Sequence, residues 1–554
     1  MRLANRRIRI LLLVFTVALL AAFVRAFWLQ GVRASSYDRM AAVQQREVVT
    51  VPARRGTIFD RTGAPLAIGE PATTVYADPH QITDPQRVAV AAARALRLNP
   101  NTVYREVSDR HRGFVYLERQ APPAAAARLE QQKLPGLGFY SEERRMYPQH
   151  RVGASVLGYV GIDDHGLAGL ELELDKQLSG RAGEQTIVKD PFGRPVNIST
   201  SRPVRDGKNV YLTIDHTIQA NADAVLARAV VHWHAKDATA IVMDPRTGAI
   251  LAMANAPGFN ANSYPQAPPL LQRNRAVTDT FEPGSTFKLV TAAGVLSEHL
   301  VTPQTSFTLP PSIRVADKVI HDAELRGTVN YTVSNIVAKS SNVGAITLAE
   351  MLGRHRLSSW ISRFGFGHET GIDFPGESPG IVLPPDQWSG SSIGTIPIGQ
   401  GIAVTPIQLA SAYAAVANGG VWVTPHLVER IHGGRRPRVH RRRVVSRAID
   451  AELTQMLRGV VIEGTGTKAA IPGYSVAGKT GTADIPNGHG GYSSQYVASF
   501  VGFVPASRPK LLILVSVNSP QGAIFGGTVS APVFQKIAKF DLQYLAIPPD
   551  QPRH

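Results

Sequence analysis

The sequence predicts an α+β fold preceded by one membrane-crossing helix, and three observations support this prediction. Strand-like segments stand at both ends of residues 209–545, while the stretch between them is mostly helical windows and loops. Residues 30–208 are a mixed region with short strand-like and helical segments. Residues 10–29 are a predominantly apolar run that contains one charge, Arg25. Terminal strands around a helical middle are typical of α+β domains in which those strands share one sheet.

The composition excludes several classes of chemistry. None of the 554 residues is cysteine, so a disulfide framework, a thiolate nucleophile and a Cys-based zinc or iron–sulfur site are excluded. Catalysis must therefore use Ser, Lys, His, Asp or Glu. Hydrophobic residues make up 44% of the chain, which is enough to build sizeable cores. The formal net charge of +17 favours polyanionic surroundings, such as nucleic acid, anionic lipid or an acidic wall polymer.

The N-terminal segment predicts the compartment. Arg2, Arg6, Arg7 and Arg9 precede the apolar run from Ile10 to Leu29. At a rise of about 1.5 Å per residue, a helix of this length spans about 30 Å, the thickness of a hydrocarbon core. Arginines before the span remain in the cytoplasm, so we expect residues 1–9 to be a cytoplasmic tail and the rest of the chain to lie outside. This placement argues against a nucleic-acid partner.

The same segment also fits a cleaved signal peptide. Val24-Arg25-Ala26 and Val32-Arg33-Ala34 both offer small-residue cleavage sites. We favour the anchored form as the prediction. Since no second apolar run approaches eighteen residues, the chain is expected to cross the membrane once.

Strand and helix patterns then follow in order along the chain. In residues 30–208, Glu47 to Pro52 is strand-like and Val88 to Leu96 is an Ala-rich helical window. From residue 209, alternation and turn signals predict strands, and spacing from Ile218 to Ala229 predicts an amphipathic helix. The predicted strands are 210–214, 238–244, 249–254, 475–482, 496–504 and 511–518, and residues 546–554 form a tail.

Three short motifs carry the candidate chemistry. They are Ser285-Thr286-Phe287-Lys288, Ser340-Ser341-Asn342 and Lys479-Thr480-Gly481. Each motif is weak alone, because a second S-x-x-K occurs at Ser507 to Lys510 and a second S-x-N at Ser516 to Asn518. Context separates the two S-x-x-K matches: Ser285 opens a helical run, whereas Ser507 lies in a turn that contains Pro509.

This residue set meets the needs of nucleophilic catalysis by serine. A serine hydroxyl needs an adjacent base, and a lysine supplies one when burial or a second cation destabilises its ammonium form. Lys288, three residues after Ser285 on a helix, can reach that hydroxyl, and Lys479 can be the second cation. Free N–H groups at the helix start can face an oxyanion. Gly481 would let an extended substrate backbone approach the strand edge.

Each residue also has an ordinary structural interpretation. Ser285 can be a helix cap, Lys288 a solvated charge, and Lys479 an edge-strand charge, with Ser340 and Asn342 as polar loop residues. Each of these interpretations is the better one for its residue alone. The three motifs together, in order and on suitable elements, favour catalysis.

At this point a family resemblance is evident. The stretch from Arg273 to Lys288 resembles the active-site region of class B penicillin-binding proteins, and so do Lys339 to Gly344 and Val476 to Ala483. Arg55 to Arg61 and Gly169-Leu170-Glu171 resemble the N-terminal pedestal module of that family. The resemblance implies a penicillin-binding serine transpeptidase domain over residues 209–545, with an antiparallel sheet flanked by helices. It also implies an elongated pedestal, or dimerisation-type, domain over residues 30–208.

The resemblance implies an acyl-transfer enzyme that crosslinks peptidoglycan and uses no metal or cofactor. In this analogy Ser285 attacks the penultimate D-alanine carbonyl of a stem peptide, Lys288 is the general base, and Ser340 with Lys479 relays a proton to the leaving amine. The substrate-binding residues would be Asn342, Thr480, Gly481 and Thr482, and the N–H groups of Ser285 and Thr482 would form the oxyanion hole. The middle residue of the second motif is Ser341 rather than Asp, which fits penicillin-binding proteins better than class A β-lactamases.

The resemblance also implies partners and a cellular role. Stem peptides ending in D-Ala-D-Ala would be the substrates, and β-lactam antibiotics would bind covalently at the same serine. Phe281 to Ser285 is most similar to septal, division-type enzymes of the bacterial cytoplasmic membrane, with elongation-type relatives as the alternative. Nothing in residues 30–203 resembles a glycosyltransferase module, so the family implies a multi-pass membrane glycan polymerase and other division proteins as partners.

Other functions compete with transpeptidation. The protein could be a penicillin-recognising sensor or an idle scaffold, although the short segment before the span leaves little room for a signalling output. Hydrolysis, as in a β-lactamase or carboxypeptidase, depends on whether water reaches the acyl-enzyme, which spacing does not show. A metal pair at His232 and His234 with Asp237 is disfavoured because histidines two apart on a helix point in different directions.

A dense arginine run is the strongest local charge feature. It comprises Arg435, Arg436, Arg438, Arg441, Arg442 and Arg443. A solvated hairpin is the first interpretation. Attraction to an anionic wall polymer or lipid is the second.

Overall fold

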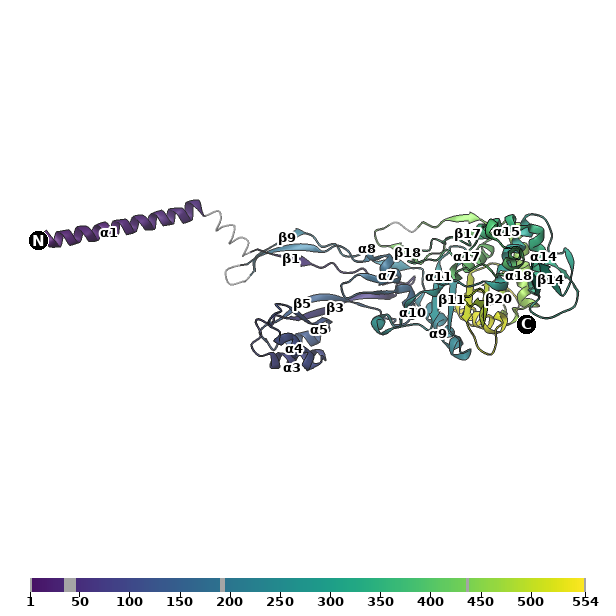
Figure 1. Ribbon diagram of the computed structural model, residues 1–554, viewed down its shortest axis with the longest axis horizontal. Helices are drawn as coiled ribbons and strands as arrows, with labels where there is room; N and C mark the ends of the chain where they lie inside the picture. Colours follow the sequence, from purple (N-terminus) through teal and green to yellow (C-terminus); the bar gives the residue numbers. More distant parts are fainter. Residues whose placement is uncertain (1, 34–45, 190–194, 435–437, 553–554) are drawn as a thin grey trace. The chain divides into compact units, whose positions relative to one another are not determined.

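A computed structural model of the chain describes residues 2–33, 46–189, 195–434 and 438–552 (Figure 1). The chain divides into two compact units. One contains residues 1–54 and 180–207, and the other contains residues 55–179 and 208–554. The boundary between the two units falls inside the predicted 30–208 module, because residues 55–179 belong to the same unit as the C-terminal domain.

The first unit contains a long apolar helix and a small sheet. Helix α1 (Arg2–Phe27) continues into a π-helical turn, η1 (Trp28–Val32). The segment Asn5–Val32 is, within the described residues, the one helix long and apolar enough to cross a membrane, and its side chains are exposed. Strands β1 (Arg46–Val51), β8 (Gly183–Lys189) and β9 (Pro195–Arg202) form an antiparallel sheet in the order β1-β8-β9.

In the second unit, residues 55–179 combine a sheet with three helices of eight to twelve residues and several shorter ones. Strand β3 (Pro65–Ala77) pairs with β2 (Ile58–Phe59), β4 (Val115–Ala121) and β5 (Leu137–Met146). Helices α3 (Pro85–Leu96), α4 (Pro100–Ser108) and α5 (Pro123–Glu130) pack at one end of β3 and β5 around a core that includes Val75, Val88 and Leu129 (Figure 1). Helix α3 begins where it does because Asp84 accepts a hydrogen bond from the Arg87 N–H and proline occupies the first helical turn. The predicted helix over residues 88–96 is confirmed.

A buried ion-pair cluster lies at the base of this sheet. Arg55 Nε donates to Glu171 at 2.8 Å, and Arg145 Nε donates to the other carboxylate oxygen of Glu171 at 2.6 Å. Arg55 also pairs with Asp175 at 2.7 Å. The side chains of Arg55, Arg145 and Glu171 are at most 3% exposed. The cluster joins the segments around the two pedestal motifs, Arg55 to Arg61 and Gly169 to Glu171.

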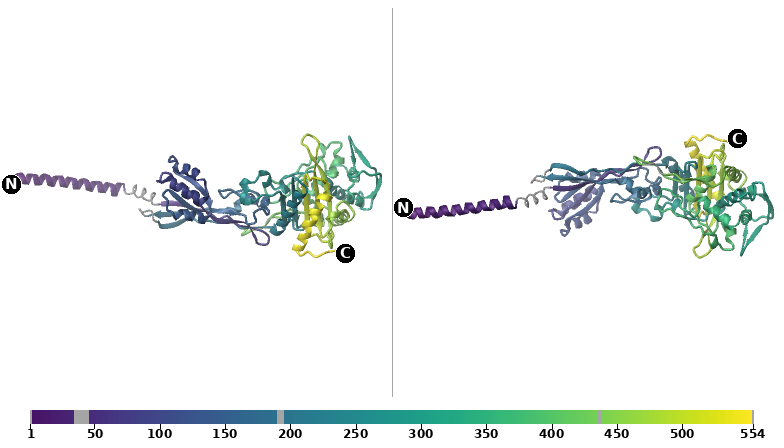
Figure 2. Two further views of the ribbon diagram at one scale, coloured as in Figure 1. Left: turned by 90° about the horizontal axis from the view of Figure 1, so that it is seen from below. Right: turned by 90° about the horizontal axis from the view of Figure 1, so that it is seen from above.

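The C-terminal domain is built on one antiparallel five-stranded sheet in the order β12-β11-β22-β21-β20. Its strands are β11 (Asp237–Met243), β12 (Ile250–Ala256), β20 (Ala477–Pro486), β21 (Tyr492–Val504) and β22 (Leu511–Asn518). The pairing of β11 with β22 confirms that strands from both ends of the domain share one sheet. Both views of Figure 2 show the yellow C-terminal segment against the teal segment that opens the domain. The predicted strand at 210–214 is shorter, β10 (Val210–Leu212), and joins the β2–β3 sheet instead, next to β18 (Val428–Ile431).

Helices cover both faces of the five-stranded sheet. Alternate residues of β22 belong to different cores: Leu512 and Leu514 to one, Ile513 and Val515 to the other. The second core lies beneath helices α9 (His216–His232) and α20 (Ala531–Tyr544). The first lies beneath α12 (Lys288–Ser297), α14 (Asn342–Leu352), α15 (Arg354–Phe364), α17 (Pro406–Ala417) and α18 (Arg447–Ile462). A strand buried on both faces explains why this segment is continuously apolar.

Short elements complete the fold. Small helices are α6 (Ala154–Leu157), α7 (Gly169–Glu173), α8 (Asp175–Leu178), α10 (Pro269–Gln272), α11 (Arg275–Thr278), α13 (Val333–Ala338), α16 (Ser392–Thr395) and α19 (Gly526–Val529). The 3₁₀ turns are η2 (Ala261–Gln266), η3 (Gly284–Phe287), η4 (Pro385–Gln387), η5 (Ile396–Ile398) and η6 (Thr467–Ala469). Two-stranded pairs are β6 (Tyr159–Val160) with β7 (Gly166–Ala168), β13 (Ser306–Leu309) with β16 (Val329–Thr332), β14 (Ser312–Val315) with β15 (Lys318–His321), and β17 (Val421–Val423) with β19 (Arg441–Arg443). The pairs within residues 306–332 add strands to a stretch for which the sequence predicted helices and loops.

The arginine run has a partly structural role. Arg442 lies over the Trp422 ring at 4.8 Å and donates to the Arg363 carbonyl, and Arg443 donates to the Gly419 carbonyl at 2.9 Å. Arg435 and Arg436 lie outside the described residues. The guanidinium groups at 442 and 443 therefore attach strand β19 to its neighbours, in addition to carrying charge.

The buried cluster predicts unequal costs for two matched substitutions. Glu171→Gln leaves two buried arginines facing a neutral amide, and we expect it to lower the free energy of unfolding by about 3 kcal/mol or more. Glu70→Gln removes an exposed pair with Arg144, and we expect a change within about 1 kcal/mol. Denaturant unfolding of the full chain in detergent measures both. Equal effects would contradict the assignment of the cluster as a stability centre.

Candidate active site

The three motifs lie on separate elements that meet at β20. Ser285 is in the 3₁₀ turn η3, Ser340 stands between α13 and α14, and Lys479 is on β20, the last strand of the sheet. Turn η3 packs against β20. The three motifs are far apart in the sequence, and the fold brings them to one site.

Gly284 and Gly481 allow turn η3 to approach the strand. Gly284 has a φ of +55°, and a Cβ there would lie 2.7 Å from the Thr482 carbonyl oxygen. A Cβ on Gly481 would lie 2.3 Å from Ser499 Oγ on β21, 2.9 Å from the Thr286 methyl carbon and 3.0 Å from the Pro283 carbonyl oxygen. The serine-bearing turn therefore lies against the face of β20 at Gly481, and the absence of a Cβ there lets the turn pack this closely. The approach of a substrate backbone along the edge of β20 stays a prediction.

Lys288 is buried beside the second motif. Its side chain is on the first turn of α12, a helix buried nearly all around, and the residue is 2% exposed. The Lys288 Nζ donates to the Ser340 carbonyl at 2.5 Å, to Ser340 Oγ at 3.2 Å and to Asn342 Oδ1 at 2.7 Å. Three oxygens thus satisfy the three donors of an ammonium group, as a buried cation requires.

The Ser285 hydroxyl is free in this arrangement. Ser285 is partly exposed, and among the described residues its hydroxyl has no hydrogen-bond partner. The sequence predicts a contact between Lys288 and Ser285, whereas the structure directs the lysine to Ser340 and Asn342. A carbonyl and an amide oxygen are better partners for a buried ammonium than a single hydroxyl.

Ser340 Oγ lies between two lysines. Lys479 Nζ donates to Ser340 Oγ at 2.9 Å, and to the carbonyl and hydroxyl oxygens of Thr480 at 3.2 and 3.3 Å. Lys479 is 1% exposed. Ser340 has a φ of +59°, a left-handed conformation that is strained for serine and that places its hydroxyl within reach of both lysines.

Burial lowers the pKa of both lysines. Desolvation lowers the pKa of Lys288 to about 7, against an opposing effect of the Asp322 charge. Desolvation and the neighbouring charge of Lys288 lower the pKa of Lys479 well below its ordinary value. Two buried ammonium groups that share one oxygen repel each other, so near neutral pH the pair favours a state with one neutral amine. A neutral amine is the form that can accept a proton.

The remaining predicted site residues lie on β20 and at the start of α14. Thr480 Oγ1 is 2.6 Å from Thr465 Oγ1, and Thr482 Oγ1 accepts from the Gly526 N–H at 3.2 Å. Within the described residues the outer edge of β20 has no strand partner, which leaves it available to an extended chain. The side-chain amide of Asn342 contacts Lys288 and the His321 carbonyl.

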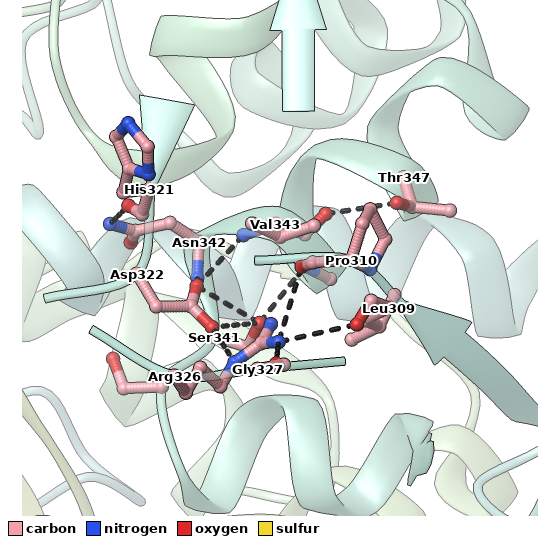
Figure 3. A network of polar contacts seen from close by, with 12 residues as sticks. Leu309, Pro310, His321, Asp322, Arg326, Gly327, Ser341, Asn342, Val343 and Thr347 are labelled. Atoms are coloured by element: carbon pink, nitrogen blue, oxygen red, sulfur yellow. Dashed lines mark hydrogen bonds and ion pairs between the residues drawn. The ribbon is translucent and has the colours of Figure 1, made fainter. Parts of the chain in front are cut away.

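Two acidic residues at the site escaped the sequence analysis. Asp322 contacts Ser341, Asn342 and Val343 at the start of α14 (Figure 3). Glu282 is buried behind the serine turn and accepts hydrogen bonds from the Gly401 N–H at 2.9 Å and the Tyr492 hydroxyl at 3.1 Å. Glu282 is three residues before Ser285, so its position in the sequence is a signal that could have identified it. No local pattern marks Asp322, which reaches the site only through the fold.

The chance motif matches lie elsewhere. The Ser507 hydroxyl donates to Asp550 at 2.5 Å, in the turn after β21, and Ser516 is part of β22. The structure therefore separates Ser507 from the lysines that surround Ser340.

One group of side chains in the described part of the chain has ligand atoms close enough for a metal ion: Asp60, Asp215 and His216. Local structure explains these side chains. Asp215 caps α9, and Asp60 accepts from the Thr62 and Ala64 N–H groups while contacting the His216 ring. His232, His234 and Asp237 do not form such a group.

Comparisons with known proteins agree on one family. Residues 238–539 match the model of the penicillin binding protein transpeptidase domain, and residues 50–212 match that of the penicillin-binding protein dimerisation domain. The chain is 34% identical to peptidoglycan D,D-transpeptidase FtsI of Escherichia coli over 98% of this chain and 92% of that protein. It is 33% identical to penicillin-binding protein PbpB of Mycolicibacterium smegmatis, over 97% and 90%.

Solved structures give the same result. The crystal structure of penicillin binding protein 3 from Mycobacterium tuberculosis, complexed with aztreonam, matches with a TM-score of 0.72 and 32% identity. The match covers 91% of this chain and 99% of that one. A peptidoglycan synthetase from Bifidobacterium adolescentis matches with a TM-score of 0.75 and 28% identity, over 92% and 98%.

The packing at Gly481 predicts a selective loss of reactivity. Gly481→Ala places a Cβ against Ser499 and against turn η3, so we expect Ser285 to react with ampicillin about 10-fold or more slowly, an increase of about 1.4 kcal/mol or more in the activation barrier. Gly459→Ala, inside α18, places a Cβ 3.6 Å from its nearest neighbour and is the matched control. Time courses of adduct formation measure both. Equal rates for the two variants would contradict the packing argument.

Proposed function

The chain belongs to the class B penicillin-binding proteins, and from this premise we propose that its site works as a peptidoglycan D,D-transpeptidase through an acyl-serine at Ser285. The observation that carries the proposal is the pair of buried lysines on one serine hydroxyl, beside a second serine whose hydroxyl is free. A free, partly exposed hydroxyl is available to an incoming carbonyl. The lysine pair supplies a neutral amine to activate it.

In the first half of the reaction the enzyme is acylated. Ser285 Oγ attacks the carbonyl carbon of the penultimate D-alanine, and its proton passes to the neutral amine of Lys288. The N–H groups of Ser285 and Thr482 stabilise the oxyanion. The C–N bond to the terminal D-alanine then breaks, and the leaving amine takes a proton through Ser340, whose hydroxyl contacts both lysines. The product is an ester at Ser285 and free D-alanine.

In the second half the ester is transferred. The amine of a second stem peptide attacks the ester carbonyl, the C–O bond to Ser285 breaks as a peptide bond forms, and the proton lost by the amine goes to Ser285 Oγ. Before acylation, the donor peptide lies along the outer edge of β20 as an added strand, held by Asn342, with Thr480 and Thr482 at its terminal carboxylate and backbone. A β-lactam follows the first half only, because its amide opens on Ser285 without releasing a leaving group.

The cellular setting follows from α1 and the relatives. The protein is anchored in a membrane, and the arginines before the span favour an N-terminus in the cytoplasm with the chain that follows the span on the periplasmic side. The similarity to FtsI supports a role in septal wall synthesis during division. A multi-pass membrane polymerase that supplies glycan strands, and other division proteins, are the expected partners.

Intact mass measurement tests the acyl-serine. The full chain, incubated with a penicillin, should gain the mass of one opened antibiotic, and Ser285→Ala should gain nothing. Ser507→Ala, in the other S-x-x-K match, is the matched control and should form the adduct as the wild type does. An adduct that survives in Ser285→Ala would contradict the assignment. Rapid loss of the adduct from the wild type would indicate a hydrolase instead.

Depletion of the protein in its own bacterium tests the septal role. Depleted cells should elongate into filaments without septa, because the enzyme that crosslinks the septal wall is missing. Microscopy of cell length and septum number gives the measurement. Loss of rod shape with normal septa would point to the elongation-type alternative.

A further inference from the structure

We propose that Asp322 is a positioning residue for this reaction, which holds the start of α14 and, through Asn342, keeps Lys288 in place for acylation. The inference rests on the proposed function, since it concerns the same Ser285 chemistry. Asp322 directly follows β15, in a loop outside all three motifs. Figure 3 shows its carboxylate between the start of α14 and Arg326.

The carboxylate of Asp322 fixes the N-terminus of α14. Its Oδ1 accepts from the Asn342 N–H at 2.5 Å and from the Val343 N–H at 3.0 Å. The Ser341 hydroxyl donates to Asp322 Oδ2 at 3.0 Å. The same Ser341 oxygen accepts a hydrogen bond from the Gly344 N–H. The first N–H groups of a helix lack partners within the helix, and a negative charge there is favourable. The second catalytic motif therefore takes its backbone position from an aspartate outside it.

Two adjacent residues hold Asn342 from both sides. Asp322 binds its backbone N–H, and the His321 carbonyl accepts from its side-chain Nδ2 at 2.9 Å. With the amide nitrogen directed to a carbonyl, Oδ1 is directed to Lys288, which it contacts at 2.7 Å. The orientation of the lysine's acceptor is thus set by residues 321 and 322.

Arg326 in turn fixes Asp322. Arg326 Nε donates to Asp322 Oδ2 at 2.6 Å, and the two side chains are 15% and 10% exposed. Its Nη1 donates to the carbonyls of Leu309, Pro310 and Gly327. The loop that carries Asp322 is therefore attached to the end of β13, and the carboxylate has little freedom to move.

Asp322 also acts on Lys288 through its charge. Among the described residues, the charged groups near the Lys288 amine are Asp322, Lys479 on β20, whose own pKa the charge of Lys288 lowers, and Arg326, which is paired with the Asp322 carboxylate. Burial lowers the pKa of Lys288, and the Asp322 charge opposes that effect. Removing the carboxylate should lower this pKa further, whereas removing the Arg326 charge should raise it.

The experiment measures acylation of the full chain by a fluorescent penicillin from about pH 5.5 to about pH 9.5, across the region where a base with a pKa near 7 titrates. In the wild type the rate should rise with pH as Lys288 loses its proton. We expect Asp322→Asn to react about 10- to 100-fold more slowly above pH 8, which corresponds to the loss of charge-assisted hydrogen bonds. The midpoint of its acid limb should move to lower pH.

Two further variants make the test decisive. Arg326→Met keeps the carboxylate, so it should move the midpoint to higher pH, and it tests the proposal even if Asp322→Asn fails to fold. Asp373→Asn removes a comparable aspartate, which accepts from the Leu427 and Val428 N–H groups at 2.6 and 2.8 Å away from the lysines. This control should leave the midpoint unchanged.

The outcomes separate cleanly. Opposite shifts for Asp322→Asn and Arg326→Met, with a slower rate in the first, support the proposal. An unchanged rate in Asp322→Asn, or a slower rate with unmoved midpoints in both variants, would overturn it and leave Asp322 as a helix cap. If the wild type itself forms no adduct at Ser285, the failure belongs to the proposed function.

Discussion

The arrangement of the site depends on one interaction, the sharing of the Ser340 hydroxyl by Lys288 and Lys479. Two amines buried this deeply cannot both carry a full charge at low cost, so their proximity produces a neutral base near physiological pH. The same proximity joins helix α12, the start of α14 and strand β20. Chemistry and tertiary structure thus depend on the same three side chains, and the strained backbone of Ser340 is maintained by the contacts around it.

The five-stranded sheet gives this interaction a rigid base. Strand β20 is at the sheet edge, where it presents Lys479 to the site and leaves a backbone edge for an extended peptide. Gly284 and Gly481 let the serine turn pack directly against it. Large, close-packed cores on both faces of the sheet hold these backbones in place. The positions of the site residues therefore depend on the packing of the domain interior.

Outside the catalytic centre, buried charged side chains connect separate segments of the chain. Glu171 and its two arginines attach distant segments of the pedestal region to each other, and Arg442 attaches β19 to Trp422. Both cases place arginine where a planar cation meets several acceptors or an aromatic ring. Asp322 and Arg326 repeat the pattern beside the active site, where the same kind of pairing bears on a reacting group.

The sequence by itself predicted the apolar helix that can span a membrane, the sheet shared by terminal strands, and the three motifs of Ser285, Ser340 and Lys479, which the fold brings to one site. These depend on local signals: apolar length, alternation, and residues a fixed number of positions apart. Only the tertiary structure decided that Lys288 binds Ser340 and Asn342, that Gly481 accommodates the protein's own turn, and that Asp322 belongs to the site. Such contacts join residues far apart in the chain, and their geometry depends on how whole elements pack, which no local pattern of residues encodes.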